Sequence, residues 1–446
     1  DRSLLNLYVG TSKGEIYNWS IRSLNQPTLK SVAKVTENSN VGVSALAFLL
    51  GNRSLVVGDT DGNVSVWFDT KDSSNNRVLS KIHELPKLDN KIVSFSSSPR
   101  DRGFIASDNK GNIGLYHATS EVKQFEIVGQ GNSYNGIAFS PKANGIIAID
   151  GNGELINYYV DNPHPETTFK TLFGKVWYEG YDKPTYSWQS TGGTDEFEPK
   201  LSLTPLIYGS LKGAIYALLI AIPLALMGAI CVSQFVHPST RNVIKPIIEI
   251  MAALPSVVLG FFAGLWLAPL LEKIFTGIMF LPILITLFTF LMLYFWNKIP
   301  LEFTGRFRVG TELFLLLFVI AFSVMLAIWL NKPLENILFA GDFKNWFYQT
   351  LGLQYDQRNS IIVGFAMGFA VIPIIFTISE DALSSIPKNL TSGSLALGAN
   401  RWQTAINIVL PSASAGIFSA IMIGFGRAVG ETMIVLMATG NTPVMD

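Results

Sequence analysis

Six apolar segments follow one another in the second half of the sequence, and each is long enough to cross a membrane. A helix needs about 20 consecutive apolar residues to span the hydrocarbon core of a bilayer. The six segments are 206–235, 248–271, 275–297, 311–331, 360–379 and 411–439. Six such runs in succession exclude a single soluble globule, and they predict an all-α, polytopic membrane domain over residues 205–446.

Charged residues are divided unevenly between the two halves of the chain. The first 200 residues carry 20 of the 33 Lys or Arg and 22 of the 33 Asp or Glu. The last 246 residues carry the remaining 13 basic and 11 acidic residues. The second half is therefore poor in charge, as a membrane domain must be. Neither half has the basic excess that binding to nucleic-acid phosphates requires, so a nucleic acid is excluded as a partner.

A repeat of 42 to 49 residues organises the first half of the chain. Four similar segments share a glycine, at Gly14, Gly62, Gly111 and Gly153, and each ends in an aromatic residue. Alternating apolar runs on both sides of each glycine predict antiparallel strands joined by tight hairpins. The repeat resembles the blades of a WD40-like β-propeller. We therefore expect a multidomain chain, with an incomplete all-β propeller-like domain over 1–160 and a connector over 161–204.

Basic residues between the apolar segments predict how the membrane domain is oriented. Alternation of six helices places the loops 236–247, 298–310 and 380–410 on one side of the membrane. Seven basic residues lie in these loops, namely Arg241, Lys245, Lys298, Arg306, Arg308, Lys388 and Arg401. Four lie on the other side, namely Lys273, Lys332, Lys344 and Arg358. The positive-inside rule then predicts that these three loops are cytoplasmic and that the propeller-like domain lies on the opposite, extracytoplasmic side of the membrane.

The third of these loops has the pattern of a docking element. Gly398 is followed after nine residues by Ile408, Val409, Leu410 and Pro411. A glycine permits a bend between two short helices, and a proline suits the first turn of the next helix. This spacing resembles the coupling loop of ABC importer permeases, which docks on a cytoplasmic ATPase subunit. The residues that match that loop are Ser392, Gly393, Ser394, Gly398, Ala399, Ile408, Leu410 and Pro411.

One departure from the family pattern concerns charge. The family has Glu-Ala-Ala where this chain has Ser392, Gly393 and Ser394. The acidic role is therefore either absent or taken by a nearby group such as Glu380 or Asp381. The alternative is an ordinary amphipathic connector, because glycine and proline are frequent in loops.

Two ionisable residues, Arg427 and Glu431, lie four positions apart in the last apolar segment. We expect them to share one helix face, and charges within a membrane must pair or face a wet pathway. Residues 424–432 and 253–260 resemble segments of the phosphate-specific permeases of ABC importers, the PstC type. The resemblance covers about residues 203–446 and leaves the two segments within 275–331 as an inserted helix pair.

The resemblance implies a phosphate pathway that includes Arg427, Glu431, Thr432 and Ser256. The arginine would meet the anion, because its planar donors match a pair of phosphate oxygens. Glu431 would hold the arginine and assist release. The alternative is an ion pair that only pins two permease subunits together.

The sequence contains no GxxxxGK[ST] motif, the loop that cradles nucleotide phosphates, so the chain is not expected to be the ATPase. The resemblance implies a transporter subunit and not an enzyme. Neither a cofactor nor a metal is expected, and ATP would be hydrolysed on a partner. The expected partners are an ABC ATPase subunit, a second homologous permease, an extracytoplasmic phosphate-binding protein and membrane lipid. Three alternatives stay open: a membrane-tethered propeller that acts as a sensor or scaffold, a permease for another oxyanion, and an extracytoplasmic enzyme in the propeller. The sequence shows no acid pair, metal cluster or nucleophile with a base that would support the enzyme.

Overall fold

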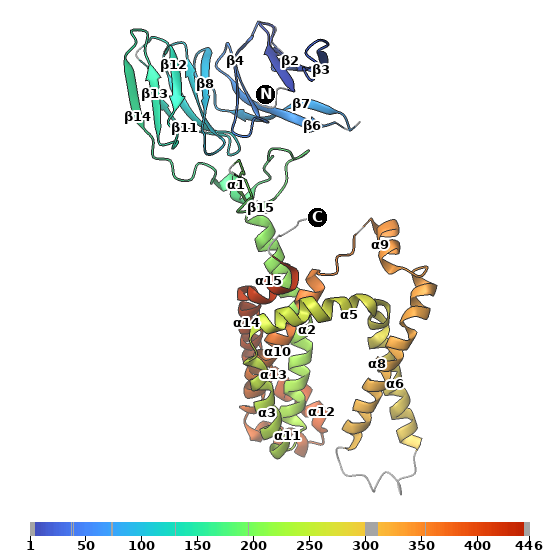
Figure 1. Ribbon diagram of the computed structural model, residues 1–446. Coiled ribbons are helices and arrows are strands. Elements are labelled where there is room, and N and C mark those ends of the chain that lie inside the picture. The colour runs from blue at the N-terminus through green and yellow to red at the C-terminus, as the bar shows by residue number, and fades with distance from the viewer. Residues whose placement is uncertain are drawn as a thin grey trace. The chain divides into compact units, whose positions relative to one another are not determined.

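A computed structural model describes residues 5–440, with gaps at 37, 39, 73–74, 130, 195, 299–310 and 353. The chain divides into two compact units, Asp1–Tyr208 and Gly209–Asn441. The first is built of antiparallel sheets and the second of helices (Figure 1). The predicted fold class, blade-like sheets followed by a helical membrane domain, is confirmed.

Four antiparallel sheets of three or four strands follow one another along the first unit. Their strands are β1 (Asn6–Gly10), β2 (Glu15–Ser20) and β3 (Thr28–Lys34); β4 (Val43–Phe48), β5 (Leu55–Asp59), β6 (Val64–Lys71) and β7 (Arg77–Leu85); β8 (Ile92–Ser97), β9 (Gly103–Asp108), β10 (Ile113–His117) and β11 (Val122–Ile127); β12 (Gly136–Phe139), β13 (Gly145–Ile149) and β14 (Leu155–Tyr159). Neighbouring sheets pack face to face through apolar side chains. The repeat aromatics Trp67 and Tyr116 are buried in these layers, with 5% and 0% of their surface exposed.

Three of the four repeated glycines, Gly62, Gly111 and Gly153, lie in hairpins that an aspartate holds closed. In the hairpin between β5 and β6, Asp59 Oδ1 accepts hydrogen bonds from the backbone N–H groups of Asp61 and Asn63, both at 2.9 Å. Gly62 has a φ of +85°, a left-handed conformation that costs glycine little. Asp108 makes the equivalent bonds in the third sheet. The period in the sequence therefore reflects one hairpin geometry used several times.

The predicted connector is an ordered part of the first unit, which extends to Tyr208. It contains α1 (Phe169–Phe173) and a small hairpin of β15 (Trp188–Gln189) and β16 (Lys200–Leu201). Arg102, 8% exposed, pairs with Glu179 at 2.9 Å and lies 3.7 Å from Glu198, which ties this segment to the sheets. The domain boundaries drawn from the sequence remain predictions.

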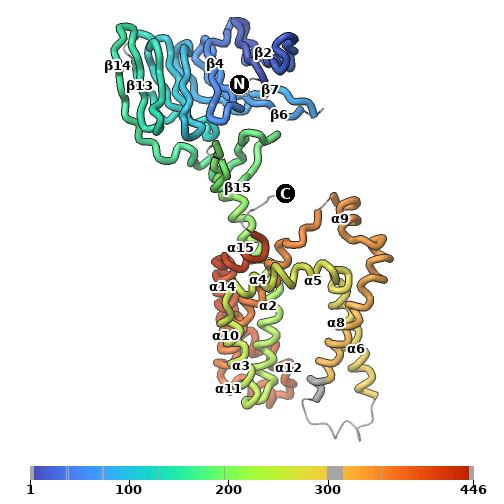
Figure 2. Tube along the Cα trace, in the orientation of Figure 1, coloured from blue at the N-terminus to red at the C-terminus, as the bar shows by residue number. Residues whose placement is uncertain are grey.

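The second unit is a helical bundle (Figure 2). Its elements are α2 (Thr204–Gln234), α3 (Pro238–Ala252), α4 (Ser256–Phe262), the π-helical turn η1 (Ala263–Leu267), α5 (Ala268–Lys273), α6 (Phe275–Lys298), α8 (Thr311–Leu338), α9 (Phe343–Leu351), α10 (Ser360–Ser384), α11 (Lys388–Ala396), α12 (Arg401–Thr404), the π-helical turn η2 (Ala405–Val409), α13 (Leu410–Ser412), α14 (Ser414–Gly430) and α15 (Met433–Thr439). Helix α10 lies at the centre. Its glycines allow close packing, because a Cβ at Gly364 would lie 2.6 Å from Tyr216 Cβ of α2.

Helices α6 and α8 form the hairpin that the sequence marked as an inserted pair, and they run side by side in Figures 1 and 2. Asn331, 6% exposed, joins their ends on the α5 side. Its Oδ1 accepts from the backbone N–H of Gly277 and its Nδ2 donates to the carbonyl of Lys273, both at 2.9 Å. The predicted loop 298–310, with Arg306 and Arg308, lies outside the described residues apart from Lys298.

Two of the predicted spans are not single helices. The segment 248–271 is interrupted at 253–255, where Pro255 disfavours a helical conformation in the residue before it. Helices α4 and α5 then run across the bundle in Figure 1, and α3 starts at Pro238, so the expected loop 236–247 is mostly helix. The segment 411–439 is interrupted at Ala413 and again at Glu431.

Five helices in the described part of the chain are long and apolar enough to cross a membrane. A sixth span results if the bent pair Arg401–Ser412 and Ser414–Gly430, which meet at 69°, counts as one. The chain is therefore a multi-pass membrane protein. The expected loop 380–410 is shorter than predicted, since α10 continues to Ser384.

We expect Gly62→Ala to destabilise the first unit more than Gly153→Ala. Both glycines have a φ of +85°, so both variants incur the cost of a left-handed residue, about 1–2 kcal/mol. Only at Gly62 would the new Cβ meet backbone, 2.1 Å from the carbonyl oxygen of Leu88. Limited proteolysis of the purified protein across a temperature series measures the difference, and equal midpoints for the two variants would contradict this account.

Candidate functional site

A buried carboxylate joins α3 to α10 at the end of the bundle where α11 and α12 lie. Glu380, on the last turns of α10, is 0% exposed. Its oxygens lie 2.5 Å from Arg241 Nη2 and 3.3 Å from Lys245 Nζ, both on α3. Lys245 also contacts Asp381 Oδ1 at 2.5 Å, and Ser384 donates to Glu380 at 2.8 Å. We call Arg241, Lys245, Glu380 and Asp381 the charge clamp.

The charge clamp satisfies a group that burial would otherwise make costly. An ionised carboxylate in an apolar interior is tolerated only when charges and hydrogen bonds surround it. Arg241 and Lys245 were expected in a loop, and instead they lie one helical turn apart on α3, facing α10. The possible acidic substitutes, Glu380 and Asp381, therefore contact α3 and not the short helices of the loop.

The segment that resembles a coupling loop consists of two short helices, α11 and α12, joined by a sharp bend. Gly398 lies at the bend with a φ of +90°, as the sequence predicted. Asn400 caps α12 by accepting from the backbone N–H of Gln403 at 2.7 Å, and Gln403 returns a bond to the backbone N–H of Asn400 at 2.9 Å. Ser394 Oγ lies 2.9 Å from Thr404 Oγ1, which links the two helices.

This loop presents apolar side chains on its outer surface. Leu397 is 92% exposed and Trp402 60% exposed. Ser392 and Gly393 are exposed on α11, while Ala399 is half-buried beside the bend. The remaining matched residues lie where the chain returns to the bundle. Ile408 lies within η2, and Leu410 and Pro411 begin α13, which precedes α14. Exposed apolar side chains on a rigid bend suit contact with another protein.

Arg427 and Glu431 do not share a helix face, so that prediction is wrong. Helix α14 ends at Gly430, and Glu431 has extended backbone angles, φ −81° and ψ 110°. Glu431 Oε1 accepts from the backbone N–H groups of Met433 and Ile434 at 3.1 and 3.3 Å, so this carboxylate caps α15. Arg427 is exposed on α14, and no ion pair joins it to another described residue. The break follows from the short side chains around it, Gly430 and Thr432, together with this alternative hydrogen bonding.

The structure places Ser256 near the start of α15. A Cβ at Gly260 would contact Ile434 and Met437, and one at Gly264 would contact Ala438, so α4 and α15 pack in parallel. Their first residues, Ser256 and Thr432 to Met433, consequently lie at the same end of this helix pair. Backbone N–H groups at helix starts carry partial positive charge. Three of the four predicted pathway residues, Ser256, Glu431 and Thr432, thus gather at these two helix starts, one turn beyond Arg427.

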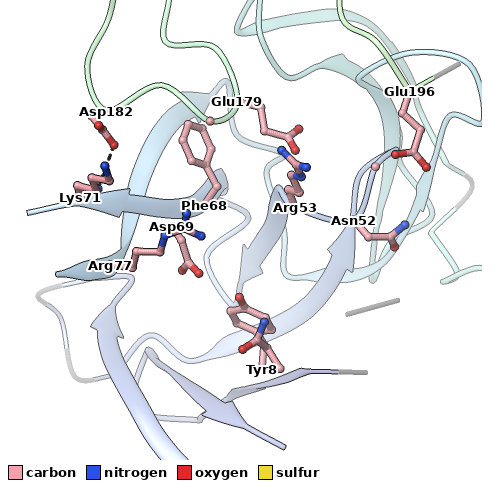
Figure 3. A pocket seen from close by; sticks show the side chains of 13 residues that line it. Tyr8, Asn52, Arg53, Phe68, Asp69, Lys71, Arg77, Glu179, Asp182 and Glu196 are labelled. Carbon is pink, nitrogen blue, oxygen red and sulfur yellow. Dashed lines mark hydrogen bonds between the residues drawn. The ribbon is translucent and has the colours of Figure 1, made fainter. Parts of the chain in front are cut away.

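A separate polar pocket of about 810 Å³ lies in the first unit, and the sequence did not indicate it (Figure 3). Opposite charges alternate around it, with Arg53, Lys71 and Arg77 beside Asp69, Glu179 and Asp182. Burial raises the pKa of Asp69 above its usual value, and it raises the pKa of Tyr8 to about 12. The backbone N–H of Lys71 donates to Asp182 at 3.2 Å. Mixed charge gives this pocket no preference for an anion or a cation.

A comparison with known protein families finds a match in the C-terminal part of the chain. The family described as binding-protein-dependent transport system inner membrane component matches residues 303–446. These residues, about a third of the chain, match this family of inner-membrane transport components, as the resemblance of the sequence to ABC permeases predicted.

Curated relatives extend this similarity. The chain is 28% identical over 249 residues to the probable ABC transporter permease protein YqgH of Bacillus subtilis, covering 56% of this chain and 55% of that one. It is 27% identical over 241 residues to the phosphate transport system permease protein PstC of Xylella fastidiosa, covering 54% and 56%. The chain thus spans about half the length of the curated relatives it matches.

The sheets of the first unit are similar to a solved propeller domain only at low level. The C-terminal WD40 domain of Sif2 matches 36% of this chain and 44% of its own at 16% identity, with a TM-score of 0.30. The description of the sheets as blades therefore rests on their own pairing and repeat.

We expect Glu380→Ala to destabilise the helical unit by about 3 kcal/mol, the low end for a broken buried ion pair, because the stranded Arg241 and Lys245 retain some access to water. Asp381→Ala is the matched control. Its carboxylate is 59% exposed, and exposed ion pairs contribute less than about 1 kcal/mol. Thermal unfolding of the two variants in detergent tests the charge clamp; equal stability would show that the burial of Glu380 is not compensated as described.

Proposed function

We propose that this permease is a subunit of an ATP-driven importer that moves inorganic phosphate into the cytoplasm. The observation that carries the proposal is Arg427, an exposed arginine on α14 that pairs with no described residue. An unpaired cation in a membrane helix is costly, about 2.5–3.5 kcal/mol at the helix centre, so it marks an ion or substrate pathway. The similarity to PstC supports phosphate as the anion.

The residues around Arg427 suit an oxyanion. The guanidinium offers parallel donors that match two phosphate oxygens. The starts of α4 and α15, with Ser256 and Thr432, add backbone and hydroxyl donors at one end of the helix pair. Glu431 occupies the first N–H groups of α15, so in this conformation it competes with the anion for those donors. This competition supports a role for Glu431 in release and not as a fixed partner of Arg427.

The proposal includes partners for both surfaces of the membrane domain. The apolar bend at Leu397 and Trp402 would dock on an ABC ATPase subunit, which supplies the energy. A second homologous permease would complete the pathway beside α14, and an extracytoplasmic binding protein would deliver phosphate. ATP binding would then move α11 and α12, and the bundle would follow because η2, α13 and α14 continue directly from them.

The basic residues support a cytoplasmic position for the α11–α12 end, which makes the first unit periplasmic. Arg241, Lys245, Lys388 and Arg401 all belong to helices at this end of the bundle. The positive-inside rule applies to residues close to the ends of spans, as these are.

We expect Arg427→Ala to reduce ATP-dependent phosphate uptake by at least about tenfold, since a charge-assisted hydrogen bond contributes about 1.5–3 kcal/mol and 1.4 kcal/mol corresponds to a factor of ten. Arg427→Lys keeps the charge without the paired donors and should retain part of the uptake. The assay uses the reconstituted complex with labelled phosphate, sulfate or molybdate.

Arg358→Ala, at an exposed arginine before α10, is the control for loss of a positive charge alone. Normal phosphate uptake by Arg427→Ala would remove Arg427 from the pathway. Uptake of sulfate or molybdate in preference to phosphate would change the assigned anion. Loss of the Arg427→Ala protein from the membrane would indicate a structural ion pair with the second permease.

Orientation is tested with two single cysteines in a Cys231→Ser background. Leu24, 84% exposed in the first unit, and Leu397, 92% exposed at the bend, should lie on opposite sides of the membrane. We expect an impermeant thiol reagent to label Leu24→Cys in intact spheroplasts and Leu397→Cys only after lysis. The reverse pattern would invert the proposed orientation.

A further inference from the structure

Helix α3 has three faces with different surroundings. Successive residues of a helix are about 100° apart. Arg241, Ile244, Lys245 and Ile248 are half-buried on the side that contacts α10 and the core. A second face is apolar and exposed, with Val243, Ile247 and Ile250 at 59%, 55% and 67% exposure. The third face is exposed and carries small or polar residues, Asn242, Pro246, Glu249 and Ala253. We call it the polar face of α3.

Glu249 is the only ionisable side chain among these four residues, and no ion pair joins it to another described residue. Glu249 lies inside 248–271, a segment predicted to be one apolar span, so the sequence pattern did not mark it. Unlike Glu380, it has no cation beside it within the part of the chain that the structure describes. Its lack of a partner needs an explanation if the carboxylate lies inside the membrane.

The charge clamp fixes the depth of Glu249. Arg241 and Lys245 pair with Glu380 and Asp381, at the end of α10, and α3 runs antiparallel to α10. Glu249 is one further turn along α3, so it lies level with about residues 373–377, near the middle of α10. From the start of α3 the rise is about 16 Å at 1.5 Å per residue. That is about half of the roughly 30 Å hydrocarbon core.

Arg427 lies at a similar depth. Helix α14 starts at the same end of the bundle as α3, because the loop that precedes it follows directly from α10. Arg427 is 13 residues into α14, which gives a rise of about 20 Å. The chain thus exposes one cation and one carboxylate near the middle of its helical unit. A carboxylate at this level cannot face lipid without a large cost, so it faces water or another protein surface.

We propose that the polar face of α3 lines a water-filled part of the transport pathway, with Glu249 as its fixed negative charge. The inference rests on the proposed permease function. An anion attracted by Arg427 alone would be held tightly, whereas conduction requires that it also leave. A carboxylate at the same level lowers the positive potential there and weakens retention of the anion.

The test uses single cysteines in the assembled complex, in a Cys231→Ser background. Glu249→Cys and Ala253→Cys report on the polar face, and Ile250→Cys is the matched control, next to Glu249 in sequence and depth but on the apolar face. Because the reactive species is the thiolate, which needs water, we expect an anionic methanethiosulfonate reagent to label the two polar-face cysteines at least about tenfold faster than Ile250→Cys. Ala253→Cys retains Glu249, so it reports on the pathway even if Glu249→Cys is inactive.

Equal labelling rates on both faces would overturn the inference. No labelling of the polar face would also overturn it and would favour a dry interface with the second permease. This comparison needs no transported anion, so its outcome is independent of whether phosphate is the substrate. Labelling of Ala253→Cys should also block phosphate uptake, since it adds bulk and negative charge to the pathway. Rapid labelling with unchanged uptake would exclude the polar face from the transport route.

Discussion

The carboxylate of Glu380 has no exposed surface. The need to neutralise it determines how α3 is rotated about its own axis where it packs on α10. Helix α3 has no fully buried residue of its own, so apolar packing alone leaves its rotation weakly defined. Arg241 and Lys245 define it, because both must reach one carboxylate. With this rotation, Ile244 and Ile248 pack against the core. Ile247 and Ile250 face outward, and Glu249 lies on the remaining, polar face. One buried charge thereby sets the surroundings of a whole helix.

Features that depend on local physics could be predicted from the sequence. The length of each apolar run reflects the thickness of a bilayer, so the long helices α2, α6, α8 and α10 were found near their true positions. The hairpin glycines Gly62 and Gly111 were found because a left-handed turn requires that residue type. Gly398 marked the bend between α11 and α12 for the same reason. In each case, the residues that cause the structural feature lie at or next to that feature in the sequence.

Features that depend on distant partners could not be predicted in this way. The spacing of Arg427 and Glu431 indicates one helix face only if the helix continues, and Glu431 ends it by capping α15. Pro255 accounts for the break before α4, but the course of α4 across the bundle depends on packing against α15. Arg241 and Lys245 counted only as basic loop residues, because nothing near them in the sequence reveals a buried carboxylate 135 positions beyond Lys245. The polar pocket of the first unit likewise joins residues from Asn6 to Glu196.

The hydrogen bonds around Gly398 also have a mechanical consequence. Ser394 and Thr404 join the two short helices across the bend, the reciprocal bonds of Asn400 and Gln403 close the start of α12, and Trp402 packs 6.2 Å from Phe235 at the end of α2. A glycine hinge alone would be compliant and would absorb a push as a change of angle. Cross-linked in this way, the loop resists a change of angle, so a displacement applied at Leu397 would be passed to α2 through Trp402.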